Sequence, residues 1–264
     1  MRESVMGTDK ELLYRNLAKS ISEWIKEQSE NVGFKNLIVG VSGGIDSAVV
    51  AGLCSHSGEK TIAMLMPDGE QKDKKDAISV CSVFNIPRWD KDISKIKKSV
   101  LSLLRTDWKI IPGGYKLAEA NLKARIRMIC LYYMANLFNG MVVGTDNADE
   151  SYVGYFTKWG DGAFDINPLG NLCKCHVYGL AEVLGVPQSI IDKAPSAGLW
   201  DGQTDEQEMG FSYEDLDQFI LCGENRSSSI SQYTIDKMLK MNFKSYHKRV
   251  PAPVYEPKFK IRGE

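Results

Sequence analysis

Residues 37–50 decide the fold of this chain: Leu37-Ile38-Val39-Gly40-Val41-Ser42-Gly43-Gly44-Ile45-Asp46-Ser47-Ala48-Val49-Val50. The start of this stretch is apolar and branched, which predicts a parallel strand buried on both faces. At Ser42-Gly43-Gly44 the two glycines permit a sharp turn with uncovered amide groups. We expect Asp46 and Ser47 at the N-cap of a following helix that continues through Ala48–Cys54. Strand, glycine turn and helix N-terminus together predict an anion site.

The pattern Ser-Gly-Gly-x-Asp-Ser at residues 42–47 differs from two better-known phosphate motifs. No Gly-Lys-Ser/Thr follows the turn, which excludes the P-loop, and no G-x-G-x-x-G indicates a dinucleotide fold. The hydroxyls of Ser42 and Ser47 and the bare amides suit pyrophosphate, and Asp46 suits Mg²⁺. An ordinary glycine turn is the alternative interpretation. The full pattern after a buried strand favours phosphate and resembles the ATP pyrophosphatases, which cleave ATP between its α and β phosphates.

Composition sets broad limits on the class of protein. The 264 residues can bury a substantial core, and the 43% hydrophobic and 25% charged content is ordinary for a globular protein. A net charge of −1 gives no general attraction to nucleic acid or membranes, and no apolar run is long enough to span a bilayer. Without a signal peptide, the six cysteines indicate reduced thiols in the cytoplasm. Cys173-x-Cys175 is too short a spacing for a zinc pair, so we expect no structural metal site.

Helical and strand patterns alternate through the first half of the chain. This alternation predicts an α/β fold with a doubly wound parallel sheet and helices on both faces. The expected helices are Asp9–Glu30, Gln71–Phe84, Ile93–Leu104 and Lys116–Phe138, and the expected further strands are Lys60–Pro67, Asn85–Ile93 and Gly140–Thr145. On the helix Lys116–Phe138, i, i+3 and i+4 steps place Asn121, Arg125, Met128 and Tyr132 on one face and turn Arg127 away.

A polar cluster from Thr145 to Glu150 follows the strand Gly140–Thr145. Ligands of doubly wound sheets bind beyond the carboxyl ends of the strands, where the strand order reverses. We therefore expect this cluster to face residues 42–47 across one cleft, with Glu150 as a second carboxylate for Mg²⁺. Beyond it, residues 152–169 predict a long ordered loop, residues 195–206 a polar loop, and four segments predict helices: 172–184, 187–193, 213–222 and 230–241.

Taken together, these segments resemble the ammonia-dependent NAD⁺ synthetases over nearly the whole chain, from Ser42 to Lys248. The motifs that carry the resemblance are Asn121-x-x-Ala124-Arg125-x-Arg127-Met128, Gly144-Thr145-x-Asn147-x-x-Glu150, Gly154-Tyr155-Phe156-Thr157-Lys158-x-Gly160-Asp161-Gly162, Pro195-Ser196-Ala197 and Gly202-Gln203-Thr204-Asp205-Glu206. The resemblance implies the Rossmann-like fold of adenine nucleotide alpha-hydrolases. It also implies amidation of deamido-NAD⁺ by ammonia through an NAD-adenylate, giving NAD⁺, AMP and pyrophosphate.

The resemblance also assigns roles to individual residues. Catalysis would rest on Asp46, Ser47 and Lys174, and Mg²⁺ on Asp46 and Glu150. ATP would be bound by Gly40, Val41, Ser42, Gly43, Gly44, Ile45, Asp46, Ser47, Thr145, Lys174 and Ser196. Deamido-NAD⁺ would be bound by Arg125, Lys158, Asp165, His247 and Lys248, among which the cations suit a pyrophosphate group. The family is homodimeric, so the resemblance implies a homodimer.

Several alternatives stay open at this point. Another ATP pyrophosphatase is one, such as a tRNA-modifying enzyme or an amidating ligase like GMP synthetase, but the balanced charge argues against a nucleic-acid partner. A non-catalytic sensor of adenine nucleotides is another, although it would not need Glu150, Lys158 and Asp165. We expect residues 1–264 to form a single domain without a glutaminase domain, so that ammonia arrives free or from a separate protein.

Overall fold

A parallel sheet of four strands in the order β3-β2-β1-β4 organises the protein. The computed structural model describes residues 7–70, 73–104, 114–195, 204–222 and 230–256. The strands are β1 (Asn36–Gly40), β2 (Lys60–Leu65), β3 (Arg88–Asp90) and β4 (Gly140–Val143). In the register of the sheet, Ile38 of β1 lies opposite Ile62 on one side and Val142 on the other.

Burial along the strands follows their apolar content. Leu37, Ile38 and Val39 of β1 have no exposed surface, as expected for a central parallel strand that is covered on both faces. The predicted strand Asn85–Ile93 is confirmed but is limited to three exposed residues at the sheet edge. Pro87 directly precedes it, and a proline supplies no amide hydrogen for a longer ladder.

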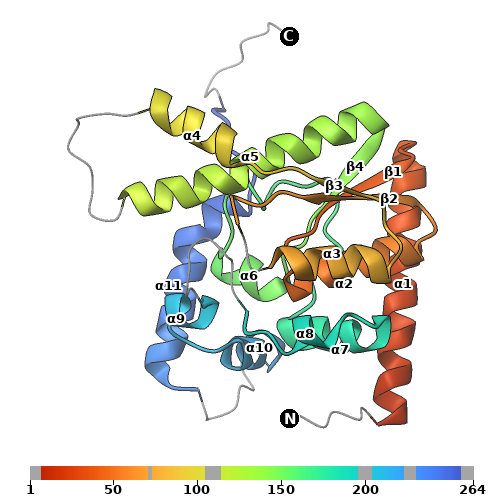
Figure 1. The fold of residues 1–264 in the computed structure, drawn as a ribbon. Helices are drawn as coiled ribbons and strands as arrows, with labels where there is room; N and C mark the ends of the chain where they lie inside the picture. The colour runs from red at the N-terminus through yellow and green to blue at the C-terminus, as the bar shows by residue number, and fades with distance from the viewer. Residues whose placement is uncertain (1–6, 71–72, 105–113, 196–203, 223–229, 257–264) are drawn as a thin grey trace, which may run out of the picture.

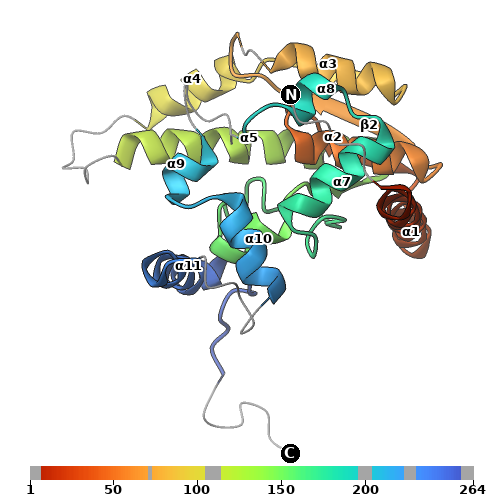
Figure 2. The same ribbon diagram turned by 90° about the horizontal axis from the view of Figure 1, so that it is seen from below.

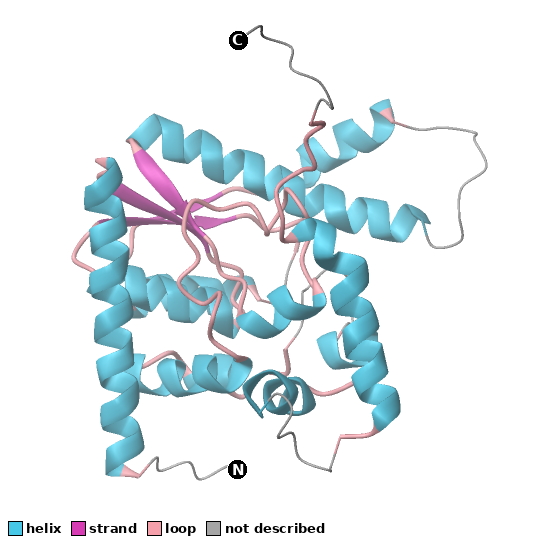
Figure 3. Ribbon diagram, turned by 180° about the vertical axis from the view of Figure 1, so that it is seen from behind, coloured by secondary structure: helices cyan, strands magenta, loops and turns pink. Residues whose placement is uncertain are grey.

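Helices cover both faces of this sheet, which confirms the doubly wound α/β class (Figures 1 and 3). The helices whose side chains share a core with one face are α1 (Thr8–Val32), α2 (Ile45–His56), α3 (Lys74–Val83), α7 (Lys174–Leu184) and α8 (Gln188–Ile191). On the opposite face lie α4 (Ser94–Leu103) and α5 (Gly114–Phe138). The sheet therefore separates two hydrophobic cores.

A third core lies outside the sheet, among the C-terminal helices (Figure 2). It is built by α6 (Ala148–Val153), α9 (Asp205–Met209), α10 (Tyr213–Cys222) and α11 (Gln232–Ser245), which the 3₁₀ helix η2 (Tyr246–Lys248) follows. Leu216 and Met238 at its centre are fully buried. The short helices α6 and α9 were not predicted, because six and five residues give too little periodicity to read. Among the described helices, none combines the length and the apolar character needed to cross a membrane.

The start of α2 differs from the prediction. Gly44, with extended backbone angles, is the N-cap residue, and Asp46 and Ser47 lie in the first turn. The hydroxyl of Ser47 is engaged inside the loop: it donates to Gly44 O at 3.0 Å and accepts from Ser42 N at 3.2 Å. Because the helix begins earlier than predicted, the side chain of Asp46 projects from its first turn and is free to meet other elements.

Candidate active site

A cavity of about 600 Å³ lies beyond the carboxyl ends of β1, β2 and β4. It is lined by Gly40–Ser47 after β1, by Met66 and Pro67 after β2, and by Gly144, Thr145 and Asp146 after β4. The strand order reverses between β1 and β4, so the cavity occupies the position where ligands of open α/β sheets bind. The expectation that residues 42–47 and 145–150 face each other is confirmed, since Asn147 Nδ2 donates to Asp46 Oδ1 at 2.9 Å.

The glycine loop at residues 42–44 is closed by its own serines. Ser42 Oγ lies 3.0 Å from Ser47 Oγ and accepts from Gly44 N at 3.2 Å. These contacts hold the loop in a tight curve at the N-terminus of α2, whose first amide groups have no partners within the helix. The loop and the helix end together have the geometry that is typical of an anion site, and the binding of an anion here stays a prediction.

Only glycine fits at position 43, because of both its backbone conformation and the lack of room for a side chain. Its φ of +88° is unfavourable for other residues, and a Cβ atom there would lie 2.4 Å from the carbonyl oxygen of Asp73. Lys193 connects the glycine loop to Asp73, because its ammonium donates to Gly43 O at 3.3 Å and to the Asp73 carboxylate at 2.8 Å. Asp73 and Lys193 line the cavity, although the sequence did not single them out.

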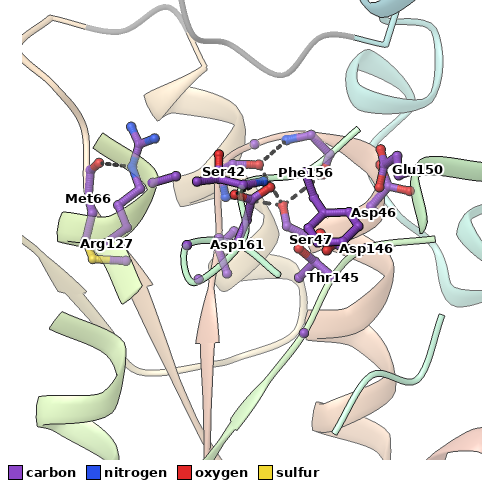
Figure 4. A pocket seen from close by; sticks show the side chains of 18 of the residues that line it. Ser42, Asp46, Ser47, Met66, Arg127, Thr145, Asp146, Glu150, Phe156 and Asp161 are labelled. Carbon is purple, nitrogen blue, oxygen red and sulfur yellow. Dashed lines mark hydrogen bonds between the residues drawn. The ribbon is translucent and has the colours of Figure 1, made fainter. Parts of the chain in front are cut away.

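A buried lysine joins the two predicted metal carboxylates (Figure 4 shows these carboxylates together at one end of the cavity). Lys174 Nζ lies 2.7 Å from Asp46 Oδ2 and 3.8 Å from Glu150 Oε1, and its side chain is 3% exposed. Burial alone would lower the pKa of Lys174, but the charges of Asp46 and Glu150 raise it above its ordinary value. The lysine is therefore a permanent cation at this end of the cavity.

Glu150 lies in an environment of negative charge. Burial, together with the charge of Asp46, raises the pKa of Glu150 well above its ordinary value. Glu150 and Asn147 form a capping box at the start of α6, in which Glu150 Oε2 accepts from Asn147 N at 3.1 Å. The hydroxyl of Tyr213 donates to Glu150 Oε1 at 3.4 Å and to Asp205 Oδ2 at 3.1 Å. Asn147, Asp205 and Tyr213 complete the site without having been predicted as site residues.

The residues of the cavity fit a divalent cation. Seven carboxylates line it but only five lysine or arginine side chains, among the described residues. Around Lys174 itself, three carboxylates of Asp46, Glu150 and Asp205 face one ammonium. A phosphate ligand would add further negative charge, which a divalent cation on the Asp46 and Glu150 oxygens would offset.

The wall formed by α5 corrects one prediction. Arg127 lines the cavity and donates to Met66 O at 3.0 Å, whereas Arg125 is exposed and does not line it. Ala124, Arg127 and Leu131 follow steps of three and four residues, which places them on one stripe, and Arg125 lies one residue off that stripe. The prediction that Arg127 points away is therefore wrong, while Asn121 and Met128 do line the cavity.

The residues predicted to bind a dinucleotide are divided between the cavity and the surface beside it. Lys248 lines the cavity, and its ammonium donates to Gly154 O and Phe156 O, both at 2.7 Å. Lys158 donates to the carbonyl of His247 and accepts at its own carbonyl from Arg125 at 3.3 Å.

Asp165 is engaged by the protein itself, and one predicted ATP residue is not placed. The Asp165 carboxylate accepts from Val142 N at 2.7 Å and from the Tyr132 hydroxyl at 3.3 Å. These contacts tie the loop after α6 to the strand β4 and to α5. Ser196 lies outside the described residues.

Comparisons with known proteins agree with this geometry. The family model described as NAD synthase matches residues 17–252. An NH(3)-dependent NAD(+) synthetase of Carboxydothermus hydrogenoformans is 42% identical over 88% of this chain and 94% of the relative. The structure of an NMN synthetase from Francisella tularensis is similar with a TM-score of 0.85 and 37% identity, covering 93% of this chain and 99% of that one. An NH3-dependent NAD synthetase from Campylobacter jejuni, in complex with the nitrate ion, is similar with a TM-score of 0.76 and 27% identity over 92% and 99% of the chains.

Proposed function

This chain belongs to the NAD synthase family, and from that premise we propose that the cavity beyond β1 and β4 is where it amidates deamido-NAD⁺. The protein is a ligase that forms a C–N bond with ammonia as the nitrogen donor and ATP as substrate. One observation supports this position for the active site. The glycine loop after β1 and the carboxylate cluster after β4 face each other at the point where the strand order reverses.

The chemistry explains why ATP is needed. A free carboxylate does not transfer its acyl group to ammonia, because oxide would have to leave. In the proposed first step, an oxygen of the nicotinate carboxylate attacks the α-phosphorus of ATP, the bond to the β-phosphate oxygen breaks, and pyrophosphate leaves. Ammonia then attacks the carbonyl carbon of the NAD-adenylate, loses a proton to solvent, and displaces AMP to give NAD⁺.

The glycine loop and the buried lysine would act on the first step. The amide groups at residues 42–47 and the hydroxyls of Ser42 and Ser47, which now contact each other within the loop, would turn to the leaving pyrophosphate when it is bound. Lys174, held as a cation by its carboxylate partners, would stabilise the negative charge that develops on the phosphates. Thr145 at the end of β4 would contact ATP from the opposite wall. In this proposal Asp46, Ser47 and Lys174 form the catalytic set.

Asp46 and Glu150 would hold Mg²⁺. When bound, the ion supplies charge to the phosphate oxygens and makes pyrophosphate a better leaving group. Asp46 is oriented toward this position by the amide of Asn147, and Glu150 by the backbone of the same residue. The two carboxylates would exchange part of their contact with Lys174 for the metal, which leaves that ammonium available to the phosphates.

We further propose a homodimer, with deamido-NAD⁺ bound near the subunit boundary. Arg125, Lys158 and His247 form one connected group on the outside of the cavity wall, where a second chain can contribute to the site. On the same helix as Arg125, three large side chains at i, i+4 and i+8 are more than half exposed: Ile129, Tyr133 and Leu137. Such a stripe on a helix is typical of a partner surface. Light scattering should give twice the chain mass, and Tyr133→Glu should shift it to the monomer.

Two broader features complete the proposal. Residues 1–264 would act as one NAD synthetase domain, since the ammonia-dependent relative is covered over 94% of its length. A cytoplasmic location is part of the same proposal, and it rests on the cysteine content of the sequence.

One assay tests the activity. Purified protein is supplied with Mg-ATP, deamido-NAD⁺ and ammonium, and the products are separated by chromatography. We expect NAD⁺, AMP and pyrophosphate in equal amounts, and no AMP when deamido-NAD⁺ is omitted. Release of AMP without deamido-NAD⁺, or none under any condition, would contradict the assignment. If the protein instead adenylates tRNA or forms GMP when the substrates of those reactions are supplied, the result would favour the activity of another ATP pyrophosphatase.

A second substrate for amidation should be tested in the same assay. The relative from Francisella tularensis is named an NMN synthetase, and it is similar to this chain over nearly its full length. Nicotinate mononucleotide carries the same carboxylate without the adenylyl half, so it can pass through the same two steps. A comparison of kcat/KM for the two acceptors assigns the preferred one.

A further inference from the structure

Next to the backbone of Lys174 lies a second group of potential ligands that the amidation does not use. Asp149 of α6, Cys173 at the N-cap of α7 and Asp217 of α10 each place one ligand atom within 4.8 Å of the others. Asp149 has no exposed surface and Cys173 is 1% exposed. The three residues are far apart in sequence, and the packing of three helices brings them together.

Each carboxylate in this group is only half satisfied. Asp149 Oδ2 accepts from Lys174 N at 2.7 Å, and Asp217 Oδ2 accepts from Cys175 N at 3.1 Å. Asp149 Oδ1 and Asp217 Oδ1 are both buried and have no hydrogen-bond partner. Buried polar atoms normally have a partner, and a buried charge needs a compensating one. Two buried carboxylates side by side therefore require a cation or a shared proton.

We propose that Asp149, Cys173 and Asp217 bind a zinc ion. A thiolate and two carboxylate oxygens form a mixed donor set that zinc accepts at tetrahedral sites, while magnesium prefers oxygen alone. Three protein ligands leave a fourth position for water. On binding, the Cys173 S–H bond breaks, a Cys173 S–Zn bond forms, and the proton leaves to solvent. The spacing rule that excludes a Cys173–Cys175 zinc pair is consistent with this site, because two of its ligands come from other helices.

The site would act on the enzyme through α7. Asp149 accepts from the backbone of Lys174, so an ion bound to Asp149 would fix the first turn of the helix that carries the catalytic ammonium. Asp149 also precedes Glu150 in the chain. Zinc here would be a structural support for both, distinct from the Mg²⁺ site, whose proposed ligands contain no sulfur.

Cobalt substitution tests the proposal without any assay of NAD⁺ synthesis. Reduced wild-type protein is titrated with Co²⁺ in excess Mg²⁺, and the absorption spectrum is recorded. We expect visible bands of tetrahedral Co²⁺ and a near-ultraviolet band of sulfur-to-cobalt charge transfer, both removed by one equivalent of Zn²⁺. Absence of the charge-transfer band in the wild type overturns the proposal directly and leaves a shared proton as the occupant.

Variants then assign the ligands. Cys173→Ser and Asp217→Asn should each abolish the charge-transfer band and the zinc that elemental analysis finds after dialysis. Cys222→Ser and Asp215→Asn, both on α10, are matched controls that should keep both signals. Circular dichroism checks that each variant is folded. Retention of the band in folded Cys173→Ser, or its loss in Cys222→Ser, would overturn the assignment. Because these readouts do not involve catalysis, they separate failure of this site from failure of the proposed function.

Discussion

The ammonium of Lys174 lies 2.7 Å from Asp46 Oδ2, although the two residues are 128 positions apart in the chain. The pair connects the first turns of α2 and α7 at one end of the cavity. It therefore brings the loop after the first strand and a helix from the second half of the chain into one site.

Replacement of Lys174 by methionine should remove the fixed cation. We expect kcat to fall by about 10²- to 10³-fold, because one preorganised group would no longer stabilise the developing phosphate charge. In metal-free buffer the free energy of unfolding should also fall by about 3 kcal/mol, because the carboxylates of Asp46 and Glu150 lose their partner. Steady-state kinetics and urea unfolding measure the two effects. Lys98→Met, at an exposed position of α4, is the control. An unchanged kcat would remove Lys174 from the chemistry.

Asp46→Asn should nearly abolish pyrophosphate release while the protein stays folded. The amide preserves the size of the side chain and one oxygen, but it binds Mg²⁺ more weakly than a carboxylate does. We expect a loss of about 10³-fold in rate, together with a higher Mg²⁺ concentration for half of the remaining activity. A coupled pyrophosphate assay over a Mg²⁺ series gives both values. The matched control Asp192→Asn lies at an exposed position after α8. Normal Mg²⁺ dependence in Asp46→Asn would show that Asp46 is not a ligand.

Two glycines with similar positive φ angles allow the effect of backbone conformation to be separated from the effect of steric contact. Gly43 and Gly58 have φ values of +88° and +82°, but only at Gly43 does a Cβ atom meet other groups, the Asp73 carbonyl oxygen among them. Gly58→Ala should cost about 1 kcal/mol of unfolding free energy from conformation alone. Gly43→Ala should cost more and should raise KM for ATP, because the loop must move away from α3. Equal effects of the two substitutions would contradict the proposed close contact.

The contact between Tyr132 and Asp165 predicts a dependence of stability on pH. Burial, and then the charge of Asp165, raise the pKa of Tyr132 to about 12 from 10.0. Between these values the folded protein keeps a proton that the unfolded chain releases, so the stabilisation is complete below pH 10 and is lost as the pH rises through 12. Urea unfolding over this range should show a steeper decline for the wild type than for Tyr132→Phe. Tyr233→Phe, at an exposed position of α11, should behave as the wild type does.

The sequence alone predicts the sheet and the glycine loop, because both depend on local signals. An apolar run, two glycines and a hydroxyl pattern are adjacent in the chain, and the facing of residues 42–47 and 145–150 follows from the topology of parallel strands. The choice between Arg125 and Arg127 depends on the exact rotation of α5 against the sheet. These two residues are two positions apart, so they differ by about 200° around the helix, and the pattern of polar side chains alone did not determine which one faces inward.

Other parts of the site depend on packing between distant segments. Tyr213 reaches Glu150 only because α10 packs against α6 and α7, and Asp205 belongs to a helix too short to predict. The capping box of Asn147 and Glu150 is a signal that could have been read, since an N-cap residue and a glutamate three positions later mark a helix start.

The third hydrophobic core has a consequence for how the cavity responds to change. One wall of the cavity belongs to the sheet, whereas Asp205 and Glu208 project from helices whose apolar side chains pack among themselves. The cavity is thus lined by residues that depend on two different hydrophobic cores. A shift of the C-terminal helices would reposition the acidic wall relative to the glycine loop while every strand pairing stays intact, so substitutions deep in these helices are expected to alter turnover with no loss of sheet order.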